Sequence, residues 1–120
     1  MALSLIKSLK IPAKIKFPND IVVLGENSSE FHKLSGILVD SKSSGSKLKE
    51  VYIGVGLNVK RQDFPSNVLG ISLEEILGSE LNLEEVFNLI LPDLSATLNE
   101  FFNNGFSSSE KEIESYKWQT

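Results

Sequence analysis

Lys49-Glu50-Val51-Tyr52-Ile53-Gly54-Val55-Gly56-Leu57-Asn58-Val59 is the stretch that predicts the fold most directly. Successive side chains of a β-strand point to opposite faces, so every second residue shares a face. One face of this stretch is entirely apolar and consists of Val51, Ile53, Val55, Leu57 and Val59. The stretch therefore predicts a strand with one buried face.

Three further strands are predicted on its N-terminal side, over residues 13–17, 21–24 and 31–40. Pro18-Asn19-Asp20 predicts a turn between the first two, because proline fixes φ while Asn and Asp bond to nearby backbone. Residues 25–30 and 41–46 are polar and are predicted to be loops. These strands are expected to be neighbours in a mixed, mainly antiparallel sheet.

Helices are predicted at both ends of the chain. Residues 1–10 have helical spacing and stop before Pro12. After Pro65 the apolar period becomes helical, with helices over 72–77, 83–102 and 107–118. Ser72 with Glu75 has the pattern of a capping box, and Pro92 is expected to kink or divide its helix. The fold class is therefore predicted as α+β, with helices packed on the sheet.

Composition excludes several classes of protein. The chain has 120 residues, 41 % of them hydrophobic and 23 % charged, which fits one globular domain and not a disordered chain. There is no cysteine, which excludes a disulfide framework or a cysteine zinc site and fits a reducing compartment. A single histidine, His32, makes a histidine-rich metal centre or a Ser-His-Asp triad improbable.

Charge is divided unevenly along the chain. Residues 1–70 hold ten Lys or Arg against six Asp or Glu, whereas residues 71–120 hold two against ten. A basic first half suits an anionic small ligand such as a nucleotide, the alternative being two solvated faces of unlike sign. We expect no nucleic-acid partner, no membrane span and a cytoplasmic location.

Three segments together resemble one family. They are Lys16-Phe17-Pro18-Asn19-Asp20-Ile21, Lys33-Leu34-Ser35-Gly36-Ile37-Leu38 and Gly54-Val55-Gly56-Leu57-Asn58. Their order and spacing are similar to the catalytic core of biotin protein ligases, with its K-W-P-N-D, K-L-x-G-I-L and G-x-G-x-N patterns. Tyr116-Lys117-Trp118 is similar to the closing helix of that domain.

Lys33 is the catalytic candidate. Adenylation needs positive charge near a phosphate that becomes pentacoordinate. In the family that this chain resembles, the matching lysine contacts both the biotin carboxyl group and the adenylate phosphate. The resemblance therefore implies that Lys33 stabilises the charge that develops during transfer, the alternative being a solvated surface lysine.

The resemblance implies that Lys16, Asn19 and Asp20 flank the nucleotide. Asp20 could bind Mg²⁺ or a ligand hydroxyl, since carboxylates suit hard cations. The same residues would also serve a simple hairpin turn. Phe17 replaces the family's usual tryptophan, which keeps an aromatic ring but loses the indole N–H donor.

Gly36 would allow a ligand to approach the strand where a Cβ would block it. Leu38 and Val39 would line the biotin pocket or its underside, or belong to a core strand. Asn58 could bond to the adenosine ribose or base, or cap the end of its strand.

The resemblance implies an ATP-dependent ligase that makes biotinyl-adenylate and transfers biotin to a lysine of a carboxylase biotin carrier domain. A lipoate or octanoate ligase relative, or an inactive fragment that binds a ligand or partner, are the alternatives. The family's upstream Gly/Arg-rich loop and small C-terminal domain have no counterpart in residues 1–120. The chain is therefore expected to be a partial catalytic domain that does not biotinylate a carrier by itself.

Overall fold

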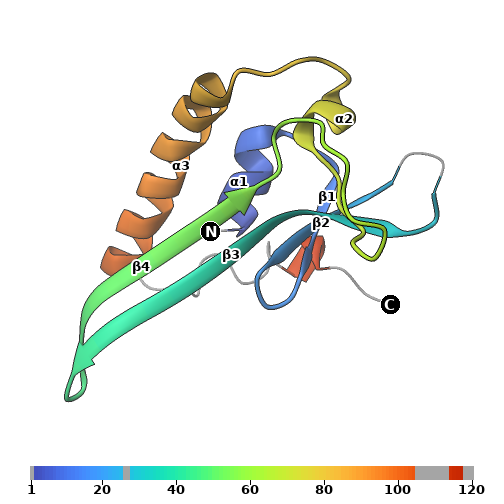
Figure 1. Ribbon diagram of the computed structural model, residues 1–120. Helices are drawn as coiled ribbons and strands as arrows, with labels where there is room; N and C mark the ends of the chain where they lie inside the picture. The colour runs from blue at the N-terminus through green and yellow to red at the C-terminus, as the bar shows by residue number, and fades with distance from the viewer. Residues whose placement is uncertain (1, 26–27, 105–113, 118–120) are drawn as a thin grey trace.

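The alternating stretch forms β4 (Lys47–Leu57), at one edge of a four-stranded sheet with the order β1-β2-β3-β4. The computed structural model describes residues 2–25, 28–104 and 114–117. The other strands, all paired antiparallel, are β1 (Ala13–Lys16), β2 (Asp20–Leu24) and β3 (Phe31–Ser44). The predicted α+β fold with a mainly antiparallel sheet is confirmed (Figure 1).

Two helices pack against each other and bury one face of the sheet. They are α1 (Ala2–Leu9) and α3 (Leu83–Asn104), drawn in blue and orange in Figure 1. The core joins side chains of both helices to those of three strands, including Leu5, Leu9, Ile15, Ile21, Ile37, Val86, Ile90 and Leu94. Within the described residues, no helix is both long enough and apolar enough to cross a bilayer.

The predicted loop over residues 41–46 is wrong. β3 continues to Ser44, β4 begins at Lys47, and the two pair along the whole arm that projects at the lower left of Figure 1. Cross-strand hydrogen bonding overrides the low strand preference of the serines, because β-propensity depends on the pairing context. Gly45 supplies the turn with a φ of 63°, which glycine adopts without steric cost.

Pro92 does not divide α3, which is continuous on both sides of it. Proline removes one backbone donor and crowds the carbonyl one turn earlier. Two serines of α1 hydrogen bond to backbone carbonyls of this region: Ser8 Oγ donates to Leu89 O at 3.4 Å and Ser4 Oγ donates to Asp93 O at 3.1 Å. These bonds also fix α1 against α3.

The predicted cap at Ser72 is confirmed at the start of α2 (Leu73–Leu77). Ser72 Oγ accepts a hydrogen bond from Glu75 N at 3.2 Å, a contact of the kind worth about 1 kcal/mol. Of the predicted last helix, residues 107–113 and 118 lie outside the described residues. Glu114–Tyr116 are helical, and Lys117 bridges to Ile15 of β1.

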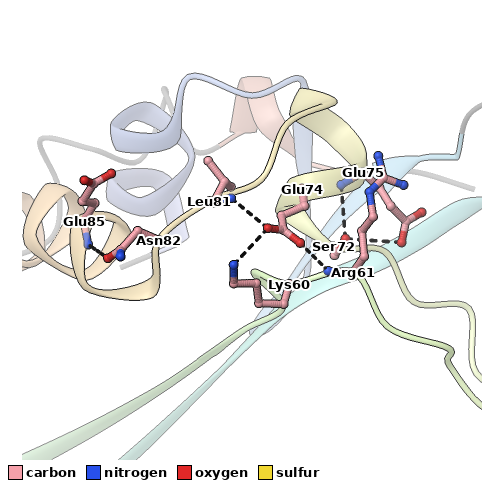
Figure 2. A network of polar contacts seen from close by, with 8 residues as sticks. All are labelled: Lys60, Arg61, Ser72, Glu74, Glu75, Leu81, Asn82 and Glu85. Atoms are coloured by element: carbon pink, nitrogen blue, oxygen red, sulfur yellow. Dashed lines mark hydrogen bonds and ion pairs between the residues drawn. The ribbon is translucent and has the colours of Figure 1, made fainter.

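A buried carboxylate joins the end of β4 to α2. Glu74 is 5 % exposed, and its two oxygens accept from Arg61 N at 2.8 Å and Leu81 N at 2.7 Å. Lys60 Nζ lies 3.3 Å from Glu74 Oε2 (Figure 2). The two backbone N–H groups and the nearby Lys60 ammonium hold the pKa of Glu74 below its usual 4.5, although its burial opposes this. Nothing in the sequence pattern distinguishes Glu74 from its exposed neighbours.

Replacing Glu74 is expected to destabilise the fold in a pH-dependent way. In Glu74→Gln the amide nitrogen cannot accept, so one backbone N–H loses its partner, and the ion pair with Lys60 is also lost. Because the folded pKa is lowered, the carboxylate stabilises the fold above pH 4.5 and this contribution disappears as the pH falls. The melting temperature of Glu74→Gln should therefore lie several degrees below wild type near neutrality and converge with it in acid.

Thermal melts of both proteins from about pH 7 to about pH 3 check this. Glu100→Gln, which removes an exposed carboxylate from α3, is the matched control. A constant difference between wild type and Glu74→Gln at every pH would contradict the role of the charge.

Candidate functional site

An irregular pairing between β2 and β3 decides where Lys33 lies. Ile21 is opposite Ser35 and Val22 is opposite Lys33, so Leu34 is an extra residue in β3. Leu34 is 0 % exposed and Ser35 is 2 % exposed, although consecutive strand residues normally point to opposite faces. Such a bulge re-aims the neighbouring side chain. Lys33 consequently shares the face of Gly36, away from the helices.

A row of four residues crosses this open face, one from each strand. Lys16 is opposite Asp20, Asp20 is opposite Gly36, and Gly36 is opposite Gly56. Directly opposed residues of an antiparallel sheet lie on the same face. The row therefore changes from charged side chains on β1 and β2 to bare backbone on β3 and β4.

Lys33 reaches across this row. Its Nζ lies 3.4 Å from Asp20 Oδ1, and the two side chains are 51 % and 29 % exposed. An ion pair with this exposure adds only about 0–1 kcal/mol to stability, so its main effect is to hold the ammonium in place. A Cβ on residue 36 would stand 3.2 Å from Lys33 Nζ, which explains why glycine suits this position.

An open cavity of about 670 Å³ lies beside the ion pair. Its floor is backbone: a Cβ on Gly54 would meet no atom within 4 Å, and one on Gly56 would meet only Gly36 O, at 3.8 Å. Leu38, opposite Gly54, is 73 % exposed. The cavity therefore has the Lys33–Asp20 ion pair at one end and an uncharged part along β3 and β4. The half-exposed ammonium can meet an anionic group of a ligand whose apolar part lies along the strands.

Asn58, the first residue after β4, also lines this cavity. Its backbone N donates to Leu34 O at 3.0 Å, and its carbonyl accepts from Leu73 N at 2.7 Å. Its side-chain Nδ2 donates to Lys33 O at 3.2 Å. Asn58 thus contacts the bulge with both backbone and side chain.

The segment before α2 holds Lys33 from the other side. Lys33 N donates to Leu69 O at 2.8 Å, and Lys33 O accepts from Ile71 N at 3.0 Å. Neither this contact nor the bulge at Leu34 is predicted by the sequence pattern. Residues 66–71 carry no pattern that indicates a parallel bridge to a strand more than thirty positions earlier.

Most residues predicted for the site are brought together. The cavity is lined by six of them: Asn19, Asp20, Lys33, Gly36, Leu38 and Asn58. Lys16 is not among the lining residues, although it lies directly opposite Asp20. Val39 is 64 % exposed and, as the next residue after Leu38, lies on the other face of the sheet. Phe17 is 48 % exposed, with Lys117 Nζ 4.8 Å from its ring centroid.

Residues 2–58 match the family described as Biotin/lipoate A/B protein ligase. The bifunctional ligase/repressor BirA of Bacillus subtilis is 31 % identical over 110 residues, which are 88 % of this chain and 32 % of BirA. The apo structure of biotin protein ligase from Aquifex aeolicus matches with a TM-score of 0.76 and 28 % identity, covering 98 % of this chain and 51 % of that one. Together these matches support a fragment of a biotin protein ligase catalytic domain.

The Aquifex aeolicus ligase in complex with biotin and ATP is also similar, with a TM-score of 0.75 and 29 % identity. That match covers 97 % of this chain and 48 % of the ligase. The chain thus spans about half the length of these structures and about a third of its curated relative BirA. Residues from all three of the segments that indicated the resemblance line the cavity.

Gly36→Ala is expected to displace the Lys33 ammonium without unfolding the protein. The new Cβ would stand 3.2 Å from Lys33 Cε and Nζ, and the flexible lysine can move aside at little cost. The Lys33–Asp20 contact should then loosen, and Lys33 should be acetylated severalfold faster in competitive labelling read by mass spectrometry. Gly54→Ala is the control, since its Cβ meets nothing. Equal labelling of Lys33 in both variants would mean that Gly36 does not shape the ion pair.

Proposed function

We propose that this chain carries the adenylation site of an ATP-dependent biotin protein ligase. In the first step the biotin carboxylate attacks the α-phosphorus of ATP, forming biotinyl-adenylate and releasing pyrophosphate. In the second step an acceptor lysine amine attacks the biotinyl carbonyl carbon and releases AMP. The observation that carries the proposal is the Lys33 ammonium, held by Asp20 at 3.4 Å and half exposed at one end of the cavity.

Lys33 would act on charge at both reacting groups. During the first step negative charge builds up on the phosphoryl oxygens, and during the second on the oxygen of the biotinyl carbonyl. A fixed ammonium aimed at these oxygens stabilises the transition state more than the ground state, which is the condition for faster turnover. Asp20 prepares this by fixing the lysine before the substrate arrives, so no reorganisation is needed during the reaction.

The remaining predicted residues divide between the two substrates. The flat floor of Gly36, Gly54 and Gly56, with Leu38 at its side, would take the apolar rings and chain of biotin. Lys16 and Asn19, near the β1–β2 turn, would contact the nucleotide, and Asn58 lines the cavity from the end of β4. This assignment agrees with the shift along the row from charged side chains to bare backbone.

Mg²⁺ would accompany the nucleotide and neutralise charge on its phosphates. Within the described residues no group of three or more His, Cys, Asp or Glu could hold a metal ion. Asp20 is the carboxylate that lines the cavity, and Mg²⁺ is commonly held by one or two carboxylates together with substrate phosphates. The residues therefore fit a metal that arrives with ATP, with Asp20 as its protein ligand.

The acceptor would be a lysine of a biotin carrier domain of a carboxylase, and the reaction would occur in the cytoplasm. Two observations favour biotin over lipoate: the Lys16-Phe17-Pro18-Asn19-Asp20 segment, and the similarity to biotin protein ligase from Aquifex aeolicus. Pyrophosphate release tested with biotin, lipoate and octanoate in turn separates these substrates. If none of the three acids leads to pyrophosphate release, the alternative of an inactive protein that only binds a ligand or partner remains.

Removing the Lys33 ammonium tests its proposed role in stabilising the charge that develops during adenylation. Lys33→Ala in the full-length protein should slow biotin-dependent pyrophosphate release by about 100- to 1,000-fold, as loss of one oxyanion-stabilising group does. Melting should change little, because the side chain is half exposed. Lys49→Ala, on the exposed arm, is the control. Unchanged turnover would remove Lys33 from the mechanism, and a collapsed melt would make it structural.

Asp20→Asn separates the two roles given to that carboxylate. The amide keeps the shape but loses the charge that would attract Mg²⁺ and hold Lys33. The Mg²⁺ concentration needed for half-maximal pyrophosphate release should rise, while Asp40→Asn, on the exposed part of β3, should leave it unchanged. A lower rate with an unaltered Mg²⁺ dependence would exclude Asp20 as a ligand and retain it as the partner of Lys33.

A further inference from the structure

We propose that Asn58 is a positioning residue that acts through Lys33, by holding the peptide from which the catalytic ammonium projects. This inference rests on the proposed function and assigns Asn58 a task other than contact with the nucleotide. The bond from Asn58 Nδ2 to Lys33 O, at 3.2 Å, is the observation behind it.

The carbonyl concerned lies at a sensitive point of the strand. Lys33 O belongs to the peptide between Lys33 and Leu34, which is the place where the alternation of β3 breaks. A small rotation of this peptide swings the Lys33 Cα–Cβ bond, and the displacement grows along four methylene groups to Nζ. The ammonium must nevertheless remain near Asp20, above the bare backbone of Gly36.

Two donors fix this carbonyl from different segments. Ile71 N donates to it at 3.0 Å from the segment before α2, and the Asn58 amide donates from the end of β4. A carbonyl oxygen has two lone pairs, so the two donors together satisfy it fully. With Ile71 alone, the peptide keeps one bond about which it can tilt.

The backbone contacts of Asn58 do not depend on its side chain. Its N–H still donates to Leu34 O and its carbonyl still accepts from Leu73 N when the amide is removed. Truncation should therefore leave the strand end and the overall fold intact. This separates a positioning role from a structural one.

The test is a double-mutant cycle of Asn58→Ala with Lys33→Ala in the full-length protein, with biotin-dependent pyrophosphate release as the assay. Asn58→Ala alone should lower kcat about 10- to 100-fold, as displacement of a reacting group by about 1 Å does, and should change the KM for ATP less than about twofold. In the Lys33→Ala background it should have almost no further effect, because the group that it positions is gone.

Two conservative variants test the donor itself. Asn58→Ser retains a hydroxyl that can donate and should recover part of kcat. Asn58→Asp has the size of asparagine but no donor, and it sets a carboxylate oxygen against Lys33 O, so it should not recover kcat. Asn99→Ala, an exposed asparagine of α3, is the matched control. Recovery by Asp rather than Ser would overturn the proposal.

Competitive acetylation of Lys33 separates failure of this inference from failure of the proposed function. Faster labelling of Lys33 in Asn58→Ala, without any biotin-dependent turnover in wild type, would support positioning and reject the ligase activity. If wild type is active, additive losses of kcat in the double mutant would reject positioning. A large rise in the KM for ATP caused by Asn58→Ala, in wild type and in Lys33→Ala alike, would also reject positioning and would make Asn58 a nucleotide contact.

Discussion

The arrangement of the candidate site depends on one extra residue in β3. If Leu34 were paired in the ordinary way, Lys33 would point toward α1 and α3, and an ammonium in that apolar layer would lose hydration worth several kcal/mol. The bulge is stable because the side chain of Leu34 is completely buried. Hydrophobic burial on one face of the sheet therefore fixes the position of a charge on the other.

Segments distant in sequence hold the bulge in place. Asn58 and Leu73 connect the end of β4 to the start of α2, and Glu74 continues the connection to Arg61 and Leu81. The helices α1 and α3 stabilise the bulge indirectly, because they bury the face of the sheet opposite the site. The acidic second half of the chain was expected to be a solvated face, but it contains the buried carboxylate of Glu74. This carboxylate holds the segments at Arg61 and Leu81 in place.

The sequence predicts the structure correctly where a local pattern and the tertiary contacts favour the same conformation. The alternation of residues 49–59, the turn at Pro18–Asp20 and the cap at Ser72 are local, and the structure has a strand, a turn and a cap there. The strand over residues 41–44 is not predicted by its own sequence, because pairing with β4 decides its conformation. The bulge at Leu34 and the bonds of Leu69 and Ile71 to Lys33 are properties of pairing between segments, which no single window of sequence expresses.

The division of the sheet into two faces has an evolutionary consequence. The side chains of Ile21 and Ile37 are buried in the core, whereas the side chain of Leu38 is 73 % exposed and the space above Gly54 is open. Substitutions of side chains on the open face can therefore change the shape of the cavity at little cost in stability. The sheet thus combines one face under strong packing constraint with one face whose side chains are free to diverge.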